Sequence, residues 1–155
     1  MNRRLKKLSY DGDLVKVVYE VQRLDDWDTV TIDAHQMPLP ALTSTLAALR
    51  PHVAAICELP DLYIRALQVR GVSLSYSACA GEETRGAVIT ALRTVRARAP
   101  LVLNTPHLRE QETADGPTLP SACAELLDEL ERQAFAYVDG QRWVAQTELF
   151  QEVSA

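Results

Sequence analysis

The alternation of apolar and polar positions predicts strands in the first third of the chain. Residues 14–21 place four apolar side chains on one face and Lys16 and Glu20 on the other, which is the period of a half-buried strand. Residues 27–33 repeat this alternation, and residues 23–26 between the two segments favour a hairpin turn. Residues 5–10 predict one more strand, because the Asp11-Gly12 pair that follows favours a tight turn.

The spacing of the apolar residues then changes from every second position to every third or fourth position. Apolar residues recur at steps of three and four from Leu39 to Ile56, which predicts a helix with one buried stripe. Pro51 falls inside this stripe, so we expect a kink or two short helices that share a face. A second apolar stripe predicts a helix over residues 120–138, ended by Asp139-Gly140.

Between the two helical stripes the pattern favours strands again. These are residues 64–76, residues 86–95 and residues 101–103, and Gly71 within the first of them indicates a bulge. Residues 80–83 favour a turn and residues 109–120 a polar loop. The order β-β-β-α-β-β-β-α predicts an α+β fold, a mostly antiparallel sheet of five to six strands with two helices on one side. We expect one domain over residues 1–140 and a C-terminal tail over residues 141–155.

Composition fits this expectation. The chain has 155 residues, of which 47% are apolar, so it can bury a core without a disulfide or a metal. No apolar run is long enough for a transmembrane span, and no apolar segment follows the basic start as in a secretory signal. The cysteines, Cys57, Cys79 and Cys123, are odd in number and far apart, which favours the reducing cytoplasm.

Charge is segregated along the chain, although the net charge is only −5. Residues 63–109 hold seven arginines and two acidic residues, whereas residues 110–155 hold two basic and ten acidic residues. Arginine donates bidentately to phosphate, so the middle of the chain is a candidate for binding phosphates. The alternative is that these charges lie on solvated faces.

Arginines and one aromatic on predicted strands suggest a platform for single-stranded DNA, in which charge follows the backbone and a ring stacks on bases. Its candidate residues are Arg65, Arg70, Tyr76, Arg85, Arg93, Arg96 and Arg98. Asn104, Thr105 and His107 follow a short apolar strand and could contact a phosphate or a base edge. The alternative for this second group is a polar turn fixed by Pro106.

No catalytic motif stands out. The histidines, His35, His52 and His107, lack metal-ligand spacing, and Cys79 has no histidine paired with it in the sequence. A carboxylate group at Asp25, Asp26 and Asp28 could hold Mg²⁺, but turn chemistry explains it better. We therefore expect a non-enzymatic protein without a metal or cofactor.

The C-terminal segment Gln146-Thr147-Glu148-Leu149-Phe150 resembles the Q-x-x-L-F peptide with which bacterial replication and repair proteins dock on the sliding clamp. Gln146, Leu149 and Phe150 are the residues that match, and Thr147 departs from the commoner apolar residue. The resemblance implies that the glutamine anchors the peptide while the two apolar side chains fill a pocket. The alternative is that Leu149 and Phe150 pack on the domain.

Four segments resemble a family of small tailed-phage and prophage proteins found among replication and recombination genes. They are Val69–Tyr76, Gly86–Val95, Pro100–Leu108 and Tyr137–Arg142. The resemblance implies action in the cytoplasm of an infected bacterium and transfers no catalytic residue.

These observations lead us to expect a DNA-metabolism accessory protein that binds single-stranded DNA and tethers to the sliding clamp. One alternative is a counter-defence protein that sequesters a small nucleotide signal, such as a cyclic dinucleotide or an ADP-ribose derivative. Another is an inhibitor of a host enzyme that acts by protein–protein contact. A homo-oligomer is compatible with each of these functions, and none requires a membrane.

Overall fold

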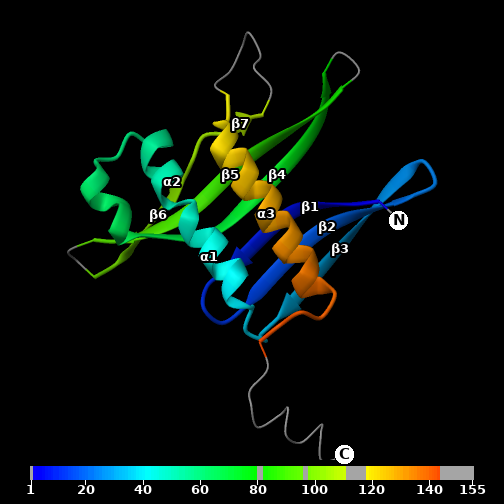
Figure 1. Cartoon of the computed structure of the whole chain (residues 1–155), viewed down its shortest axis with the longest axis horizontal. Helices are drawn as coiled ribbons and strands as arrows, with labels where there is room; N and C mark the ends of the chain where they lie inside the picture. Colours follow the sequence, from blue (N-terminus) through cyan, green and yellow to red (C-terminus); the bar gives the residue numbers. More distant parts are fainter. Residues whose placement is uncertain (1, 80–81, 96–97, 111–117, 144–155) are drawn as a thin grey trace, which may run out of the picture.

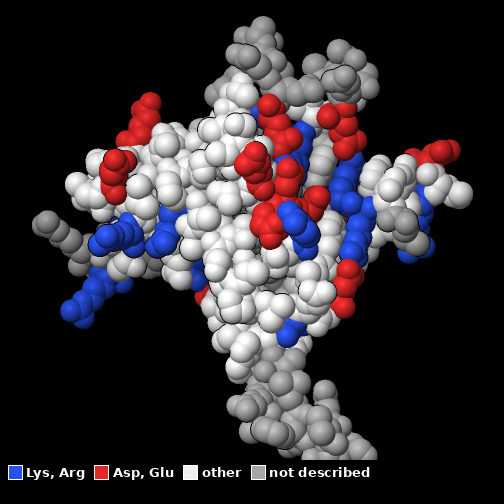
Figure 2. All heavy atoms as spheres, in the orientation of Figure 1, with Lys and Arg blue, Asp and Glu red and all other residues white. Residues whose placement is uncertain are grey.

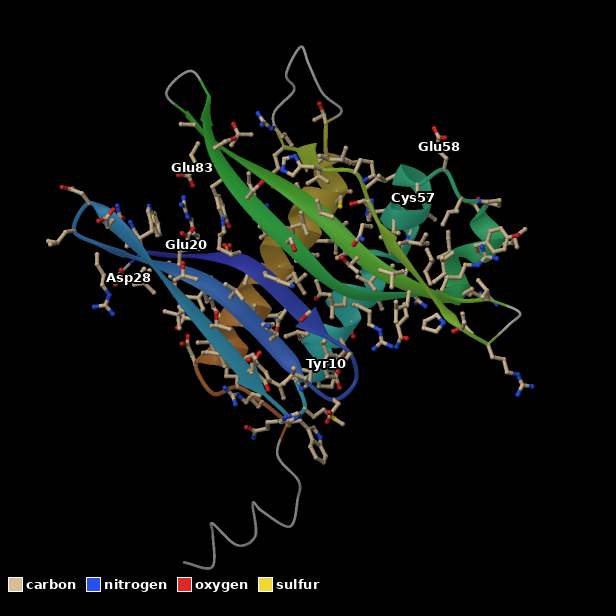
Figure 3. All side chains as sticks on the ribbon, turned by 180° about the vertical axis from the view of Figure 1, so that it is seen from behind. Tyr10, Glu20, Asp28, Cys57, Glu58 and Glu83 are labelled. Atoms are coloured by element: carbon tan, nitrogen blue, oxygen red, sulfur yellow. The ribbon has the colours of Figure 1, made fainter. Side chains whose placement is uncertain are left out.

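The fold consists of one antiparallel sheet with helices on one of its two faces. The computed structural model describes residues 2–79, 82–95, 98–110 and 118–143. All helices lie in front of the sheet in Figure 1, and the view from behind in Figure 3 shows the other face uncovered. The expected α+β class and one-sided arrangement of helices are confirmed.

The first three strands form a meander, as predicted. They are β1 (Arg3–Tyr10), β2 (Val15–Arg23) and β3 (Asp26–Ala34). The turn between β1 and β2 contains Gly12 with φ +99°, and the turn between β2 and β3 contains Leu24 with φ +55°. Glycine adopts a positive φ without strain, whereas a residue with a side chain loses free energy in this conformation.

The first apolar stripe forms two short helices, one of the two outcomes expected around Pro51. They are α1 (Pro40–Ala48) and α2 (Arg50–Ile56), and a 3-10 helix, η1 (Asp61–Ala66), follows them. Leu42, Leu46 and Val53 of the stripe are buried against the sheet. The prediction that residues 64–66 begin a strand is wrong, because η1 continues to Ala66.

The remaining strands complete a sheet in the order β3-β2-β1-β4-β5-β6. They are β4 (Leu67–Cys79), β5 (Glu82–Thr94), β6 (Pro100–Asn104) and β7 (Leu108–Arg109), which pairs with β5 beyond the end of β6. The register of β4 on β5 shifts between Val69 and Gly71, which confirms the expected bulge. Two predictions need correction, because Glu82 and Glu83 belong to β5 rather than to a turn, and Arg109 belongs to β7 rather than to a loop.

The last helix, α3 (Ser121–Val138), packs diagonally across the covered face of the sheet (Figure 1). Its side chains Leu127, Leu130 and Ala134 have no exposed surface, and burial of this stripe supplies most of its stability. The hydroxyl of Tyr137 donates a hydrogen bond of 2.5 Å to Gln36 O. Gly140 has φ +103° just past the helix, which confirms the predicted stop.

A short seam joins the two halves of the sheet. β1 pairs with β4 only where Lys7–Ser9 face Gly71–Ser73. A Cβ atom added at Gly71 would lie 2.3 Å from Leu8 O, so the close approach of these strands requires glycine. On either side of the seam β1 and β4 have no pairing in the described residues.

Candidate nucleic-acid interface

Three of the predicted arginines meet at one end of the sheet. Arg93 lies opposite Leu67 in the β4–β5 pair, and Arg65 comes two residues before Leu67 in η1. Arg98 belongs to the turn that leads into β6, where its N–H donates to Val95 O. We call Tyr63, Arg65, Arg93 and Arg98 the basic end. Figure 2 shows basic side chains at the left of the view, with acidic ones above them, and a group of acidic side chains over α3.

The geometry of the basic end suits phosphate contacts. The guanidinium carbon of Arg93 lies 3.8 Å from the centre of the Tyr63 ring, so the ring holds this side chain in place by a cation–π contact. A guanidinium stacked by its face keeps its N–H groups free at its edge for a phosphate. Arg65 and Arg98 are exposed, and none of these three arginines has an ion pair among the described residues.

Arg85 lies away from the basic end and already has anionic partners. It donates hydrogen bonds to Glu110 and to Asp128, at 2.6 Å for the latter, and only 11% of its side chain is exposed. Burial lowers the pKa of Arg85, but the hydrogen bonds to the two carboxylates outweigh this effect and raise it overall. The expectation that Arg85 contacts nucleic acid therefore has no support from its surroundings.

Tyr76 lies in the space between β1 and β4 that opens after Ser73, where the two strands are no longer paired. We call this space the split. The hydroxyl of Tyr76 donates to Leu5 O at 2.6 Å, and burial is the largest cause of its raised pKa. Arg4 stacks on its ring and on that of Trp27, with the guanidinium carbon 4.5 and 4.0 Å from the ring centres. The ring of Tyr76 is thus engaged within the protein and is not presented for stacking on a base.

The charges around this split link the two halves of the sheet. Arg4 donates to Glu20 at 3.0 Å and to Glu83 at 3.1 Å, and in Figure 3 these two glutamates point toward one another from different hairpins. On the helix side, Glu131 accepts the N–H of Leu5 at 3.1 Å. The cluster replaces the missing ladder bonds between β1 and β4, so its role is to hold the halves together.

Arg70 lies apart from the basic end, at the bulge of β4. It lines a groove together with Arg50 and Tyr10. The expectation that Arg65 and Arg70 share a strand is wrong, because Arg65 lies in η1. Arg96 lies outside the described residues, as do Gln146, Leu149 and Phe150 of the expected docking peptide.

The side chains of Asn104 and Thr105, at the end of β6 and just after it, form hydrogen bonds to β5 within the sheet. The Thr105 hydroxyl accepts the N–H of Ile89 at 2.9 Å and is buried, while the Thr90 hydroxyl donates to Asn104 Oδ1 at 2.7 Å. Both bonds keep the chain beside β5 between β6 and β7. Thr105 is therefore closed to a ligand, whereas Asn104 and His107 are exposed on the open face.

His107 forms a pair that the sequence did not suggest. Its Nε2 lies 2.7 Å from Ser75 Oγ, which places an imidazole beside a hydroxyl. The ring occupies the space over Gly86, where an added Cβ would lie 2.3 Å from Nε2. In the sequence, the signal for this pair was a glycine, Gly86, that faces Ser75 on the neighbouring strand. This combination is common in sheets and does not by itself indicate a contact with a histidine. The pair is exposed on an open sheet face and lacks a third group that would orient the imidazole among the described residues.

Tyr63 and Arg50 were missed because their importance depends on packing between η1, α2 and the sheet. Tyr63 stands only two residues before Arg65, so an aromatic beside an arginine was the available signal.

The described residues contain no group of three or more His, Cys, Asp or Glu side chains that could hold a metal ion. None of their helices has the length and apolar character needed to cross a membrane. Comparisons of the chain with protein-family models, curated proteins and solved structures found no match.

Proposed function

We propose that the protein is a non-enzymatic accessory of DNA metabolism that binds single-stranded DNA at its basic end. The observation that carries the proposal is the stacking of Arg93 on Tyr63, with Arg65 and Arg98 exposed beside it. The arginines supply charge along the backbone of the strand, Tyr63 holds Arg93 in place, and its exposed neighbour Leu62 supplies apolar surface for a base.

The distribution of charge disfavours binding over α3. Acidic side chains gather over this helix on the covered face (Figure 2), and they repel a polyanion. A strand that contacts three arginines releases few counterions, so binding is weak and its logarithmic dependence on salt has a slope of about −2.

The setting of this activity follows from the C-terminal segment and the phage-like segments of the sequence. In the proposal, Gln146, Leu149 and Phe150 dock on the sliding clamp of an infected bacterium, in its cytoplasm. A tether raises the effective concentration of a weak DNA-binding site near replicating DNA. This explains how a binding site with three cations could be sufficient.

The DNA-binding proposal is tested by fluorescence anisotropy with a labelled oligothymidine at several salt concentrations. The variant Arg65→Gln, Arg93→Gln, Arg98→Gln is expected to bind at least about tenfold more weakly and to lose the salt dependence. The matched control Lys16→Gln, Arg23→Gln, Arg132→Gln removes the same charge elsewhere and is expected to retain binding. Equal binding by the wild type and the basic-end variant would overturn the proposal.

The tether is tested separately by capture of purified bacterial sliding clamp on the immobilised protein. Leu149→Ala with Phe150→Ala is expected to abolish capture, because these side chains fill the apolar pocket in the proposed mode. Leu62→Ala is the control for loss of an exposed leucine elsewhere and is expected to leave capture unchanged. Capture that survives the double substitution would exclude this docking mode.

A further inference from the structure

A groove lies on the side of the seam opposite Tyr76. β1 ends at Tyr10 and turns back, whereas β4 extends to Leu67, so the first residues of β4 have no β1 neighbour. α1 and the start of α2 close the space from the helix side, and the cavity has a volume of about 190 Å³. Tyr10, labelled in Figure 3, lies at the rim where β1 ends.

Two guanidinium groups line this groove with unused donors. Arg70 Nε is buried and has no hydrogen-bond partner in the described residues, and a buried donor without a partner is costly. Within the same described ranges, Arg50 donates only through Nε, to Ala47 O at 3.1 Å. The remaining N–H groups of the two side chains can bind an anion that enters the groove.

Asp11, a carboxylate that interacts with Arg70, does not cancel this charge. Asp11 interacts electrostatically with Arg70, but its Oδ1 already accepts the N–H groups of Asp13 and Leu14, at 2.9 and 2.8 Å. These two bonds hold the pKa of Asp11 below its usual range, and the bond from Leu14 has the larger effect. One carboxylate against two arginines leaves a net positive groove.

The other walls suit a flat ring. Leu46, Leu67 and Val69 give the groove an apolar lining, and Tyr10 adds an aromatic side chain. Thr43, whose hydroxyl donates to Pro40 O, and Gln68 supply polar atoms. Apolar walls with a few convergent polar groups are characteristic of small-ligand sites.

We propose that this groove binds a nucleoside monophosphate unit, with the phosphate on Arg50 and Arg70 and the base against Tyr10 and the apolar wall. The volume is below the about 300–1,000 Å³ of typical ligand pockets, so the groove takes one nucleotide unit rather than a cyclic dinucleotide. The unit is either a free nucleotide or the phosphorylated end of a DNA strand. Only the second source depends on the proposed function of the basic end.

The test is isothermal titration calorimetry with thymidine monophosphate, thymidine, and oligothymidines with and without a 5′-phosphate. The wild type is expected to bind the monophosphate at least about tenfold more tightly than thymidine, which is the gain from one charge-assisted bidentate contact. Arg70→Gln is expected to remove this preference and Arg70→Lys to restore part of it. Arg132→Gln, an exposed arginine of α3 that does not line the groove, is the matched control and is expected to retain it, with thermal melting to confirm that each variant is folded.

The outcomes separate the sources and the two proposals. Preference for the 5′-phosphorylated oligothymidine that Arg70→Gln abolishes indicates a strand end, and preference for the free monophosphate alone indicates a small nucleotide. Binding of the monophosphate by a protein that ignores oligothymidine supports the groove and overturns the basic end. Equal binding of phosphorylated and unphosphorylated ligands, or binding unchanged in Arg70→Gln, overturns the groove.

Discussion

Arg85 on β5 and Asp128 on α3 form an ion pair 2.6 Å long that fastens the last helix to the sheet. Glu110, just after β7, shares the same guanidinium. We expect Arg85→Gln to lower the free energy of unfolding by about 2 kcal/mol, since it leaves two carboxylates without their cation in a partly buried site. Urea unfolding measures the loss.

The matched control is Arg132→Gln on the same helix. Arg132 pairs with Glu129 at 2.5 Å, but 72% of its side chain is exposed, so this substitution is expected to change the free energy of unfolding by less than about 0.5 kcal/mol. Equal losses in the two variants would show that Arg85 is no more than a surface charge.

Two glycines of the sheet are expected to tolerate alanine very differently. At Gly71 the added Cβ meets backbone atoms, Leu8 O at 2.3 Å and Ser9 Cα at 2.9 Å, so β1 must move away from β4. At Gly86 it meets the end of the exposed His107 side chain, which can swing aside. Urea unfolding should show a loss of about 3 kcal/mol for Gly71→Ala and less than about 1 kcal/mol for Gly86→Ala.

The double variant Gly86→Ala, His107→Ala provides the check on this reasoning. If the cost of alanine at Gly86 comes from the imidazole, it is expected to vanish once His107 is absent. A cost that persists would mean that the backbone at Gly86 is responsible.

The pair of Arg3 and Asp139 makes stability depend on acid. Two hydrogen bonds, of 2.9 and 2.6 Å, join their side chains, and the bond from Arg3 holds the pKa of Asp139 below its usual value. The folded state therefore binds this proton less readily than the unfolded chain. The contribution of the pair to the free energy of unfolding is fully present above the usual Asp pKa of about 3.9. It is lost as the pH falls through the lowered pKa of Asp139 in the folded state.

Asp139→Asn is thus expected to be less stable than the wild type at pH 7, by less than about 1 kcal/mol because the pair is largely exposed. The difference should disappear near pH 2, where the carboxyl group of Asp139 in the wild type is protonated and therefore as uncharged as the asparagine of the variant. Asp33→Asn serves as the control, since Asp33 has no ion pair among the described residues. A difference between Asp139→Asn and the wild type that does not change with pH would contradict this account.

Cys123 is expected to report on unfolding of the core. Its side chain lies on the buried face of α3 and is fully buried, and burial raises the pKa of its thiol to about 11. Iodoacetamide at pH 8 should therefore label it only when the helix leaves the sheet. Mass spectrometry with increasing urea should show labelling of Cys123 that follows the loss of circular dichroism. Rapid labelling in the absence of urea would show that α3 opens locally.

The β2–β3 turn should be open to stabilisation. Leu24 adopts φ +55° and is 98% exposed, so it gains no burial in return for its backbone conformation. Leu24→Gly is expected to raise the free energy of unfolding by up to about 1 kcal/mol, less the entropy that glycine loses on folding. A lower melting temperature for this variant would mean that the leucine side chain contributes a contact that outweighs its strain.

Periodicity predicted the elements whose burial is one-sided. Val15 and Val17 alternate with polar residues in β2, and Leu127 and Leu130 follow the period of α3, so each pattern matches the face that the fold covers. It failed at residues 64–66, where three residues are too few to show a period and Pro60 favours the start of a 3-10 turn. The strand β7 has only two residues and exists because β6 ends early along β5.

The arginines were harder to place, because sequence spacing does not reveal partners. Arg85 and Arg93 look alike in the sequence, eight positions apart on one strand and on the same face of the sheet. They differ because Glu110 and Asp128 approach the first and Tyr63 approaches the second. The strand order and the path of α3 decide this difference, and both are long-range properties.

The short seam has a consequence during synthesis of the chain. The β1–β3 meander leaves the ribosome first, but Leu5 and Leu8 on its inner face are covered only when α3, beginning at Ser121, has been made. At about 5–20 residues per second, translation of the intervening part takes roughly 5–20 s. During this time three strands with one apolar face have no helix to cover them. A nascent chain stopped before Ser121 should therefore be a client for chaperones, whereas one extended past Val138 should release them.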